Sequence, residues 1–218
     1  MGADATRLKR ILGENRAELV RLEGSLVSAA RGRDMQAIYV TSARPREGKT
    51  TAAASIAHGL CMAHEGEVVL VEGNTRAPAF HELFDVARDA PGLTDFLASK
   101  AGLEDVVVRG SADAPAIIPC GTGHGAGLGM AAFKERLRDL RDNFRYVVFD
   151  GDAVFSSSAP ALQAPFFNGT VLVVECGETK WEVVNLARRT LADAGAVVLG
   201  VVLNRREYAI PAGLYQKV

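Results

Sequence analysis

A glycine, a lysine and two threonines follow an apolar run early in the chain, and side chains of these types at this spacing can bind phosphate. The run ends at Val40, and the segment TSARPREGKTT occupies 41–51. The segment fits the pattern G-x-x-x-x-G-K-[ST], with Ala43 in place of the first glycine. In such a loop, backbone N–H groups at the start of a helix face the phosphates, and the helix dipole favours their negative charge.

The loop predicts contacts with a magnesium-bound nucleotide, ATP or ADP. We expect Lys49 to neutralise the β- and γ-phosphate oxygens, and the hydroxyl of Thr50 to join the coordination of Mg²⁺. The residues expected to line the nucleotide are Ala43, Arg44, Pro45, Arg46, Glu47, Gly48, Lys49, Thr50 and Thr51.

Polar residues also follow two later apolar runs. Glu72, Asn74 and Arg76 follow the first of them. Asp150 and Asp152 follow the second. The carboxyl ends of parallel strands meet where such sheets bind ligands, so we expect these residues near the loop. An acid after an apolar strand is the expected partner of Mg²⁺, which favours Asp150, whereas Asp152 is equally well explained as an acid in a solvated turn.

The elements that must position these residues alternate along the chain. Six apolar runs are expected as strands: 37–40, 68–71, 116–118 (the weakest), 146–149, 171–174 and 197–203. Helical segments are expected at about 50–64, 130–143 and 181–194. The runs are apolar on both parities, which is typical of parallel strands covered on both faces. We therefore predict an α/β fold, a doubly wound, mostly parallel sheet flanked by helices.

Three regions follow from this pattern. Residues 1–34 form an N-terminal region with an amphipathic helix over about 5–31, residues 35–207 form the nucleotide-binding domain, and 208–218 form a short tail. The glycine-dense segment 121–129 lacks a strand–turn–helix context, so we expect a flexible connection there and not a phosphate cradle. Trp181 is expected to cap or pack the helix that it begins.

Composition excludes several classes of protein. The chain has 218 residues, with 25 Lys and Arg against 26 Asp and Glu, and this balance argues against a globally basic nucleic-acid-binding protein. Its three cysteines have no metal-ligand spacing, which favours a reducing compartment. We expect no signal peptide, and no apolar run approaches the roughly 20 residues that span a bilayer. A cytoplasmic protein is expected.

Five segments, in this order, resemble the bacterial tyrosine kinases of capsule and exopolysaccharide synthesis, within the MinD- and ParA-related P-loop ATPases. They are TSARPREGKTTAAASIAHGL, VVLVEGNTRAPAFHELF, GLTDFL, YVVFDGDA and LGVVLNR. The resemblance covers about 14–207. It implies a Walker A loop at 41–51, a second acidic motif (Walker A′) that begins at Glu72, and a Walker B acid at Asp150. It also places Asn204, and beside it Arg205, near the adenine.

The resemblance implies a reaction and a role for each matching residue. The γ-phosphoryl group of MgATP would pass to tyrosine, with Lys49 on the phosphates and with Thr50 and Asp150 on the metal. Glu72 would be the base for the tyrosine hydroxyl, and Arg76 would stabilise the developing charge.

Several positions depart from the family pattern. Arg46 stands where the family usually has glycine, at a backbone position that favours positive φ. Glu72 and Asn74 replace the two aspartates of Walker A′, and a displacement of about 1 Å in a reacting group can cost ~10²-fold in rate. After Walker B the family usually has a small residue and two prolines, where this chain has Gly151, Asp152 and Ala153. We hypothesise that Asp152 restores the lost charge near Mg²⁺, to which Asn74 offers only a neutral oxygen.

Two features linked to assembly are also altered. The helix motif E-x-x-R-x-x-R is matched by Glu18 and Arg21, but Gly24 replaces the last arginine and weakens the helix by roughly 1 kcal/mol relative to Ala. The tyrosine cluster of the family tail is reduced to Tyr208 and Tyr215. Both are weak candidates for autophosphorylation.

Three functions are open. The first is an ATP-binding tyrosine-kinase-family enzyme that regulates exopolysaccharide or capsule polymerisation and export. The second is a catalytically impaired regulator with the same fold, and the third is a MinD- or ParA-like ATPase, which Pro45 and Arg46 disfavour. The resemblance implies a separate membrane co-polymerase that recruits the chain to the inner face of the membrane, and a homo-oligomer. A basic helix face is either the docking face or an ordinary solvated face: Arg7, Lys9, Arg10, Arg16 and Arg21.

Overall fold

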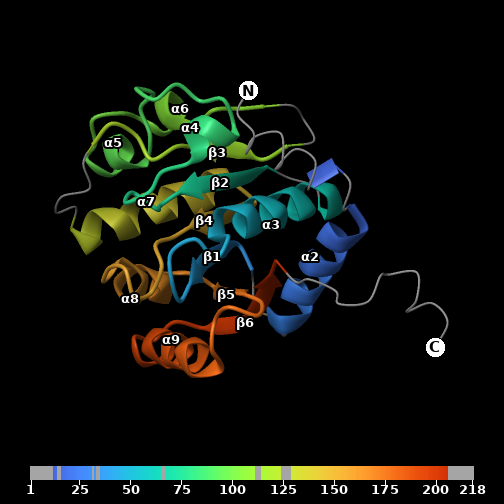
Figure 1. Cartoon of the computed structure of the whole chain (residues 1–218). Helices are drawn as coiled ribbons and strands as arrows, with labels where there is room; N and C mark the ends of the chain where they lie inside the picture. Colours follow the sequence, from blue (N-terminus) through green and yellow to red (C-terminus); the bar gives the residue numbers. More distant parts are fainter. Residues whose placement is uncertain are drawn as a thin grey trace.

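A single parallel sheet organises the computed structural model, which describes residues 12–13, 16–30, 32, 35–64, 67–110, 114–123 and 129–205. Within these residues, six strands lie in the order β3-β2-β4-β1-β5-β6 (Figure 1). The strands are β1 (Ala37–Ser42), β2 (Val68–Glu72), β3 (Ala116–Ile118), β4 (Tyr146–Asp150), β5 (Gly169–Glu175) and β6 (Val198–Asn204). All six expected strands, including the weak one, are confirmed.

Helices connect the strands and cover both faces of the sheet. They are α2 (Arg16–Ala30), α3 (Lys49–Ala63), α4 (Phe80–Leu83), α5 (Leu93–Leu97), α6 (Leu103–Val106), α7 (Met130–Asn143), α8 (Ala159–Gln163), the 3₁₀ turn η1 (Ala164–Phe166) and α9 (Trp181–Asp193). Apolar residues of α2 and α3 form one core on one face, whereas those of α5, α7 and α9 form a second core on the other. The expectation of a doubly wound α/β sheet is therefore confirmed.

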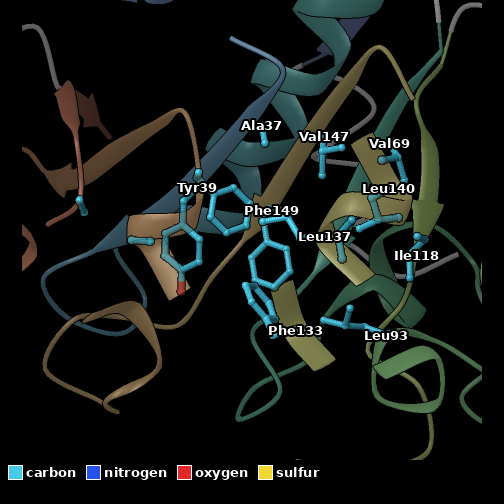
Figure 2. Close-up of a cluster of buried hydrophobic side chains, with 14 of the residues drawn as sticks. Ala37, Tyr39, Val69, Leu93, Ile118, Phe133, Leu137, Leu140, Val147 and Phe149 are labelled. Atoms are coloured by element: carbon cyan, nitrogen blue, oxygen red, sulfur yellow. The ribbon is translucent and has the colours of Figure 1, made fainter. Parts of the chain in front are cut away.

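The buried strands supply alternate residues to the two cores. Ile38 and Val40 of β1 join the core under α3, whereas Tyr39 joins the core under α7. Figure 2 shows the rings of Tyr39, Phe133 and Phe149 gathered in that second core. Tyr39 stacks on Phe149 with ring centroids 5.5 Å apart. Apolar residues of both parities are needed because both faces are covered.

The N-terminal helix packs closely against α3. A Cβ added at Gly59 of α3 would lie 2.9 Å from the carbonyl oxygen of Leu19, so the glycine permits the close approach of α2. The two helices are also joined by His64 and the buried Glu23, whose side chains are 2.5 Å apart. Arg21 and Gly24 are exposed on the other side of α2.

Several predictions lie outside the described residues. Arg7, Lys9 and Arg10 of the basic helix face are among them, as are Tyr208 and Tyr215. The boundaries of the three regions stay predictions.

The structure also differs from the sequence expectations. The short helices α4, α5, α6 and α8 were not expected, because four or five residues are too few to show a helical period. Trp181 was expected to cap or pack the helix; it begins α9 and is 69% exposed, so the packing alternative is wrong. Val184, Ala187 and Leu191 supply the buried face of α9. Among the helices of the described ranges, none is long and apolar enough to cross a bilayer.

Candidate nucleotide-binding site

The strand-to-helix turn between β1 and α3 lies at the centre of the carboxyl edge of the sheet. β1 is flanked by β4 on one side and β5 on the other. The chain leaves β1 through α3 toward β2, whereas β4 leads to β5 on the opposite side. This reversal of winding marks the place where doubly wound sheets bind ligands. The first turn of α3 directs its backbone N–H groups to this edge, which suits an anion.

Two residues before α3 have left-handed backbone conformations. Arg46 has φ 69°, which agrees with the expectation that this position favours positive φ, and its side chain is exposed. Gly48 has φ 89°, and an added Cβ would lie 1.9 Å from Nδ2 of Asn204. That amide donates a hydrogen bond to the carbonyl oxygen of Glu47 at 2.9 Å. A side chain at 48 would displace Asn204, so glycine is required there.

The Glu47 carboxylate holds the loop in shape. Its Oε2 accepts a hydrogen bond from the backbone N–H of Arg44 at 2.8 Å. Its Oε1 accepts a hydrogen bond from the hydroxyl of Thr179, in the turn between β5 and α9. The side chain is buried, so these bonds are made away from solvent. Sequence reasoning included Glu47 only as a member of the loop.

Removing this carboxylate should loosen the loop. In Glu47→Ala, the N–H of Arg44 and the hydroxyl of Thr179 lose their partner, so we expect the free energy of unfolding to fall by about 2 kcal/mol. We expect nucleotide affinity to fall about tenfold because the loop must then be ordered on binding. Denaturant titration and nucleotide titration measure the two effects.

Thr179→Val is the matched variant, since it removes one of the two bonds and leaves the loop sequence intact. We expect it to have a smaller effect than Glu47→Ala on both quantities. Unchanged nucleotide affinity in Glu47→Ala would show that the carboxylate does not shape the binding loop.

Two of the four residues expected near magnesium, Thr50 and Asp150, lie in direct contact. Oγ1 of Thr50 donates a hydrogen bond to Oδ2 of Asp150 at 2.6 Å. The other oxygen, Oδ1 of Asp150, is buried and has no hydrogen-bond partner among the described residues. A hydroxyl and a carboxylate with a free buried oxygen fit the oxygen ligands that Mg²⁺ takes alongside phosphate and water. In the described part of the chain, no three His, Cys, Asp or Glu side chains gather as a metal-binding group.

Negative charge is concentrated around Asp150. The pKa of this carboxyl is raised to about 7: burial is the largest cause, the charges of Glu72 and Asp152 add to the rise, and the Thr50 hydrogen bond and Lys49 oppose it. Glu72 is the register partner of Asp150 on the neighbouring strand. Lys49 is only 6% exposed at the same edge. A divalent cation here would favour the ionised carboxylate.

Both carboxylate oxygens of Glu72 bind backbone amides. Oε1 accepts hydrogen bonds from the N–H groups of Ala79 at 2.5 Å and Phe80 at 2.8 Å. Oε2 accepts one from Cys120, just after β3, at 2.9 Å, and the side chain is only 2% exposed. A base needs a free oxygen that faces its substrate. This geometry gives Glu72 a structural role: it joins β2 to the start of α4 and to the end of β3.

The rest of the second acidic motif is a tight turn. The amide of Asn74 donates to the carbonyl oxygen of Ala77 at 3.3 Å. Arg76 is exposed and lines a cavity beside the turn. A Cβ added at Gly73 would lie 1.9 Å from the ring of Phe149. The backbone of the turn therefore packs directly against the ring of Phe149, which leaves no room for a side chain at 73.

Asp152 lies deeper than a solvated turn acid. It is 4% exposed, and its Oδ2 accepts a hydrogen bond from the hydroxyl of Ser157 at 2.6 Å. Its carbonyl oxygen accepts one from Thr41 of β1 at 2.6 Å. The preceding residue must be glycine, because a Cβ added at Gly151 would lie 2.3 Å from the hydroxyl oxygen of Tyr39. Sequence reasoning missed Ser157 and Tyr39.

The remaining expected residues surround the loop. Ala43 is buried, Arg44 and Pro45 are exposed, and Thr51 lies in the first turn of α3. Asn204 ends β6 beside the loop, and Arg205, the next residue, pairs with Glu175 at 2.7 Å. Asn204 is thus in contact with the loop, although whether it meets an adenine stays a prediction.

The sequence of the chain is similar to those of several known proteins. No family model matches it. It is 27% identical over 178 residues to the tyrosine-protein kinase CpsD of Streptococcus agalactiae, which covers 80% of this chain and 77% of the relative. The chain is homologous to the bacterial tyrosine kinases. It is also 28% identical over 182 residues to the succinoglycan biosynthesis transport protein ExoP of Rhizobium meliloti, covering 81% of this chain and 23% of that protein.

Solved structures share the fold of this tyrosine-kinase homologue. The kinase domain of VpsO superposes with a TM-score of 0.75 at 24% identity, covering 89% of this chain and 98% of that one. The septum site-determining protein MinD of Pyrococcus horikoshii, complexed with Mg-ADP, gives a TM-score of 0.66 at 22% identity, covering 83% and 76%. The chain therefore has the fold of the MinD-related P-loop proteins.

Proposed function

We propose that this chain binds MgATP at 41–51 and transfers the γ-phosphoryl group to tyrosine, and that it thereby regulates exopolysaccharide or capsule polymerisation and export. The observation that carries the proposal is the contact between Thr50 and Asp150 beside the buried Lys49, at the start of α3. These three groups supply a cation for the phosphates and two oxygen ligands for a metal. The names of the homologues support the reaction and the pathway.

Phosphoryl transfer depends mainly on positioning and on electrostatic stabilisation. The amides of the loop and the ammonium of Lys49 would bind and orient the phosphates. Thr50 and Asp150 would hold Mg²⁺, which neutralises the charge that develops on the transferred group. Arg76, which is exposed beside the turn, would stabilise the same charge. The roles of Asn74 and Asp152 on the metal stay predictions.

A catalytically impaired regulator is the second candidate. The observation that favours it is the engagement of both Glu72 oxygens with backbone amides, which leaves Walker A′ without a free carboxylate. Such a protein would bind nucleotide without transferring phosphate, and would regulate the same machinery through the difference between its nucleotide-bound and nucleotide-free states. The two candidates differ in a single outcome, the appearance of phosphate on tyrosine.

Lys49→Met is the direct test of the proposed reaction. Incubation of the wild-type chain with MgATP and a tyrosine-containing acceptor peptide should give phosphotyrosine, measured by mass spectrometry of the peptide. Because the lysine binds the transferred phosphoryl group, we expect Lys49→Met to lower the rate by at least about 10²-fold. Nucleotide binding without phosphotyrosine in the wild type would contradict the kinase and favour the regulator.

The partner and the location are part of the proposal. A separate membrane co-polymerase would recruit the chain to the inner face of the membrane, and copies of the chain would assemble with one another. Arg21 is exposed on α2, so its side of the helix can serve either contact. Nucleic acid is not an expected partner, since acidic and basic residues balance.

A further inference from the structure

One phenylalanine lies outside the two apolar cores. Phe155, in the segment between β4 and α8, is 46% exposed, whereas the other eight phenylalanines are buried or half-buried. Within the described part of the chain, no aromatic ring packs against it. A single exposed apolar side chain is ordinary on a protein surface, so exposure alone assigns no role to it.

Backbone hydrogen bonds fix Phe155 beside the phosphate-binding loop. The N–H of Val154 donates to the carbonyl oxygen of Ser42 at 2.8 Å, and the N–H of Phe155 donates to that of Ala43 at 3.2 Å. Ala43 is the first residue of the segment that matches the pattern G-x-x-x-x-G-K-[ST]. The backbone of Phe155 is therefore attached to the start of this loop, while its side chain is exposed to solvent.

Phe155 and the expected adenine contact lie on opposite sides of the loop. β1, which leads into the loop, has β4 on one side and β5 followed by β6 on the other. Asn204 ends β6, whereas Asp150 ends β4 and precedes Phe155 by five residues. A nucleotide with its base at Asn204 and its metal at Asp150 would direct its γ-phosphate to the β4 side. The acceptor must approach that phosphate in line with the bond that breaks.

An aromatic ring at this place can distinguish tyrosine from the other amino acids that carry a hydroxyl. Serine and threonine have no ring, whereas two aromatic rings attract one another at centroid separations of about 4.5–7 Å and gain more than apolar burial alone provides. A reacting hydroxyl must also be held about 3–3.5 Å from the atom that it attacks. Contact with the ring of the acceptor would therefore orient its hydroxyl as well as bind it.

We propose that Phe155 selects tyrosine as the acceptor: the ring of the incoming tyrosine packs against the ring of Phe155, at the side of the loop where the γ-phosphate lies. This inference rests on the proposed function and adds a specificity-determining residue to it. It also gives a reason for an exposed aromatic side chain whose backbone is bonded to the loop.

Binding of the ring at Phe155 adds no chemical step to the proposed transfer. A bond forms between the phenolic oxygen and the γ-phosphorus, and the bond from that phosphorus to the bridging oxygen of ADP breaks. ADP leaves with the electron pair of the broken bond, and the phenolic proton is released to solvent.

Phe155→Ala tests the proposal in a binding measurement that needs no turnover. The probe is the fluorescein-labelled peptide AAEFAA, in which phenylalanine replaces the acceptor tyrosine, titrated with the chain in the presence of MgADP and followed by anisotropy. We expect its Kd to rise about tenfold in Phe155→Ala and by a smaller factor in Phe155→Leu, which keeps the apolar bulk but removes the ring. The peptide AAESAA should bind weakly and equally to the wild type and Phe155→Ala.

The same variant should separate acceptor binding from nucleotide binding. With MgATP and the peptide AAEYAA, we expect the KM for the peptide to rise about tenfold in Phe155→Ala. The KM for ATP and the affinity for MgADP should change by less than about twofold, because the backbone bonds to Ser42 and Ala43 remain. Leu186→Ala, at a 56% exposed apolar position on α9, is the matched control and should leave all these quantities unchanged.

Three outcomes would overturn the proposal. Equal affinity of the wild type and Phe155→Ala for AAEFAA, with phosphotyrosine still formed on AAEYAA, would overturn this inference alone. Loss of MgADP affinity in Phe155→Ala in proportion to the loss of peptide affinity would show that Phe155 shapes the loop and does not contact the acceptor. A wild-type chain that binds MgADP but gives no phosphotyrosine would refute the proposed kinase function, and the acceptor role of Phe155 with it.

Discussion

Replacing Asp150 with Asn should abolish magnesium-dependent nucleotide binding and at the same time stabilise the unliganded chain at neutral pH. The carboxylate is the acidic ligand that we propose for the metal, and Asn supplies no charge to bind it. The same carboxylate is costly without the metal, because burial raises its pKa to about 7 and Glu72 and Asp152 repel its charge. Function and stability therefore make opposite demands at this position.

The sign of the stability effect follows from the two pKa values. An aspartate in the unfolded chain has a pKa of about 3.9, so the folded chain binds this proton more tightly. The resulting stabilisation is fully present below the unfolded value and is lost as the pH rises through about 7. The loss is on the order of 4 kcal/mol across that range.

Denaturant titrations between pH 4 and pH 8 measure this difference. The free energy of unfolding of the wild type should fall toward neutral pH relative to that of Asp150→Asn. Asp142→Asn, at an exposed position on α7, should follow the wild type. Parallel pH dependence in the wild type and Asp150→Asn would show that the Asp150 carboxyl is not destabilised by its surroundings.

Replacing Glu72 with Ala should destabilise the fold more than any other single change at this edge. Its carboxylate accepts hydrogen bonds from the N–H groups of Ala79, Phe80 and Cys120. Each buried N–H that loses its partner costs about 1–3 kcal/mol, so the free energy of unfolding should fall by about 3 kcal/mol or more. That loss is a large part of the 5–15 kcal/mol typical of a domain.

Glu72→Asp separates the structural role from a catalytic one. It restores the acid that the tyrosine-kinase family usually has here, but its side chain is one methylene shorter than the three amides require. We expect a smaller loss of stability than in Glu72→Ala, and no gain in tyrosine phosphorylation. Faster phosphorylation by a folded Glu72→Asp chain would show that the carboxylate at 72 acts as the base after all.

The central part of the site could be predicted because its signals are local or topological. The apolar run 37–40, the segment with Gly48 to Thr50, and the helix that follows are adjacent in sequence. The contact between Thr50 and Asp150 joins residues 100 positions apart. The carboxyl ends of parallel strands meet at one edge of the sheet, so the strand pattern predicts that these residues lie close together.

Other parts of the site depend on contacts between distant residues that no local sequence pattern predicts. Glu72 reaches Cys120, 48 residues away, because β3 happens to lie beside β2. Glu47 accepts a hydrogen bond from Thr179, which lies in the turn between β5 and α9, 132 residues away in the sequence. Trp181 was expected to cap or pack its helix, but its position at the first residue of α9 leaves the side chain 69% exposed. These features follow from the three-dimensional arrangement of the strands.

All of these expectations depend on nucleotide binding at the turn between β1 and α3. The most direct measurement is a calorimetric titration of ADP into the wild-type chain and into Lys49→Met, each with and without magnesium. We expect saturable binding to the wild type, stronger with magnesium, and loss of that binding in Lys49→Met. Equal binding by the two proteins, or none by the wild type, would contradict the assignment of this edge as the nucleotide site.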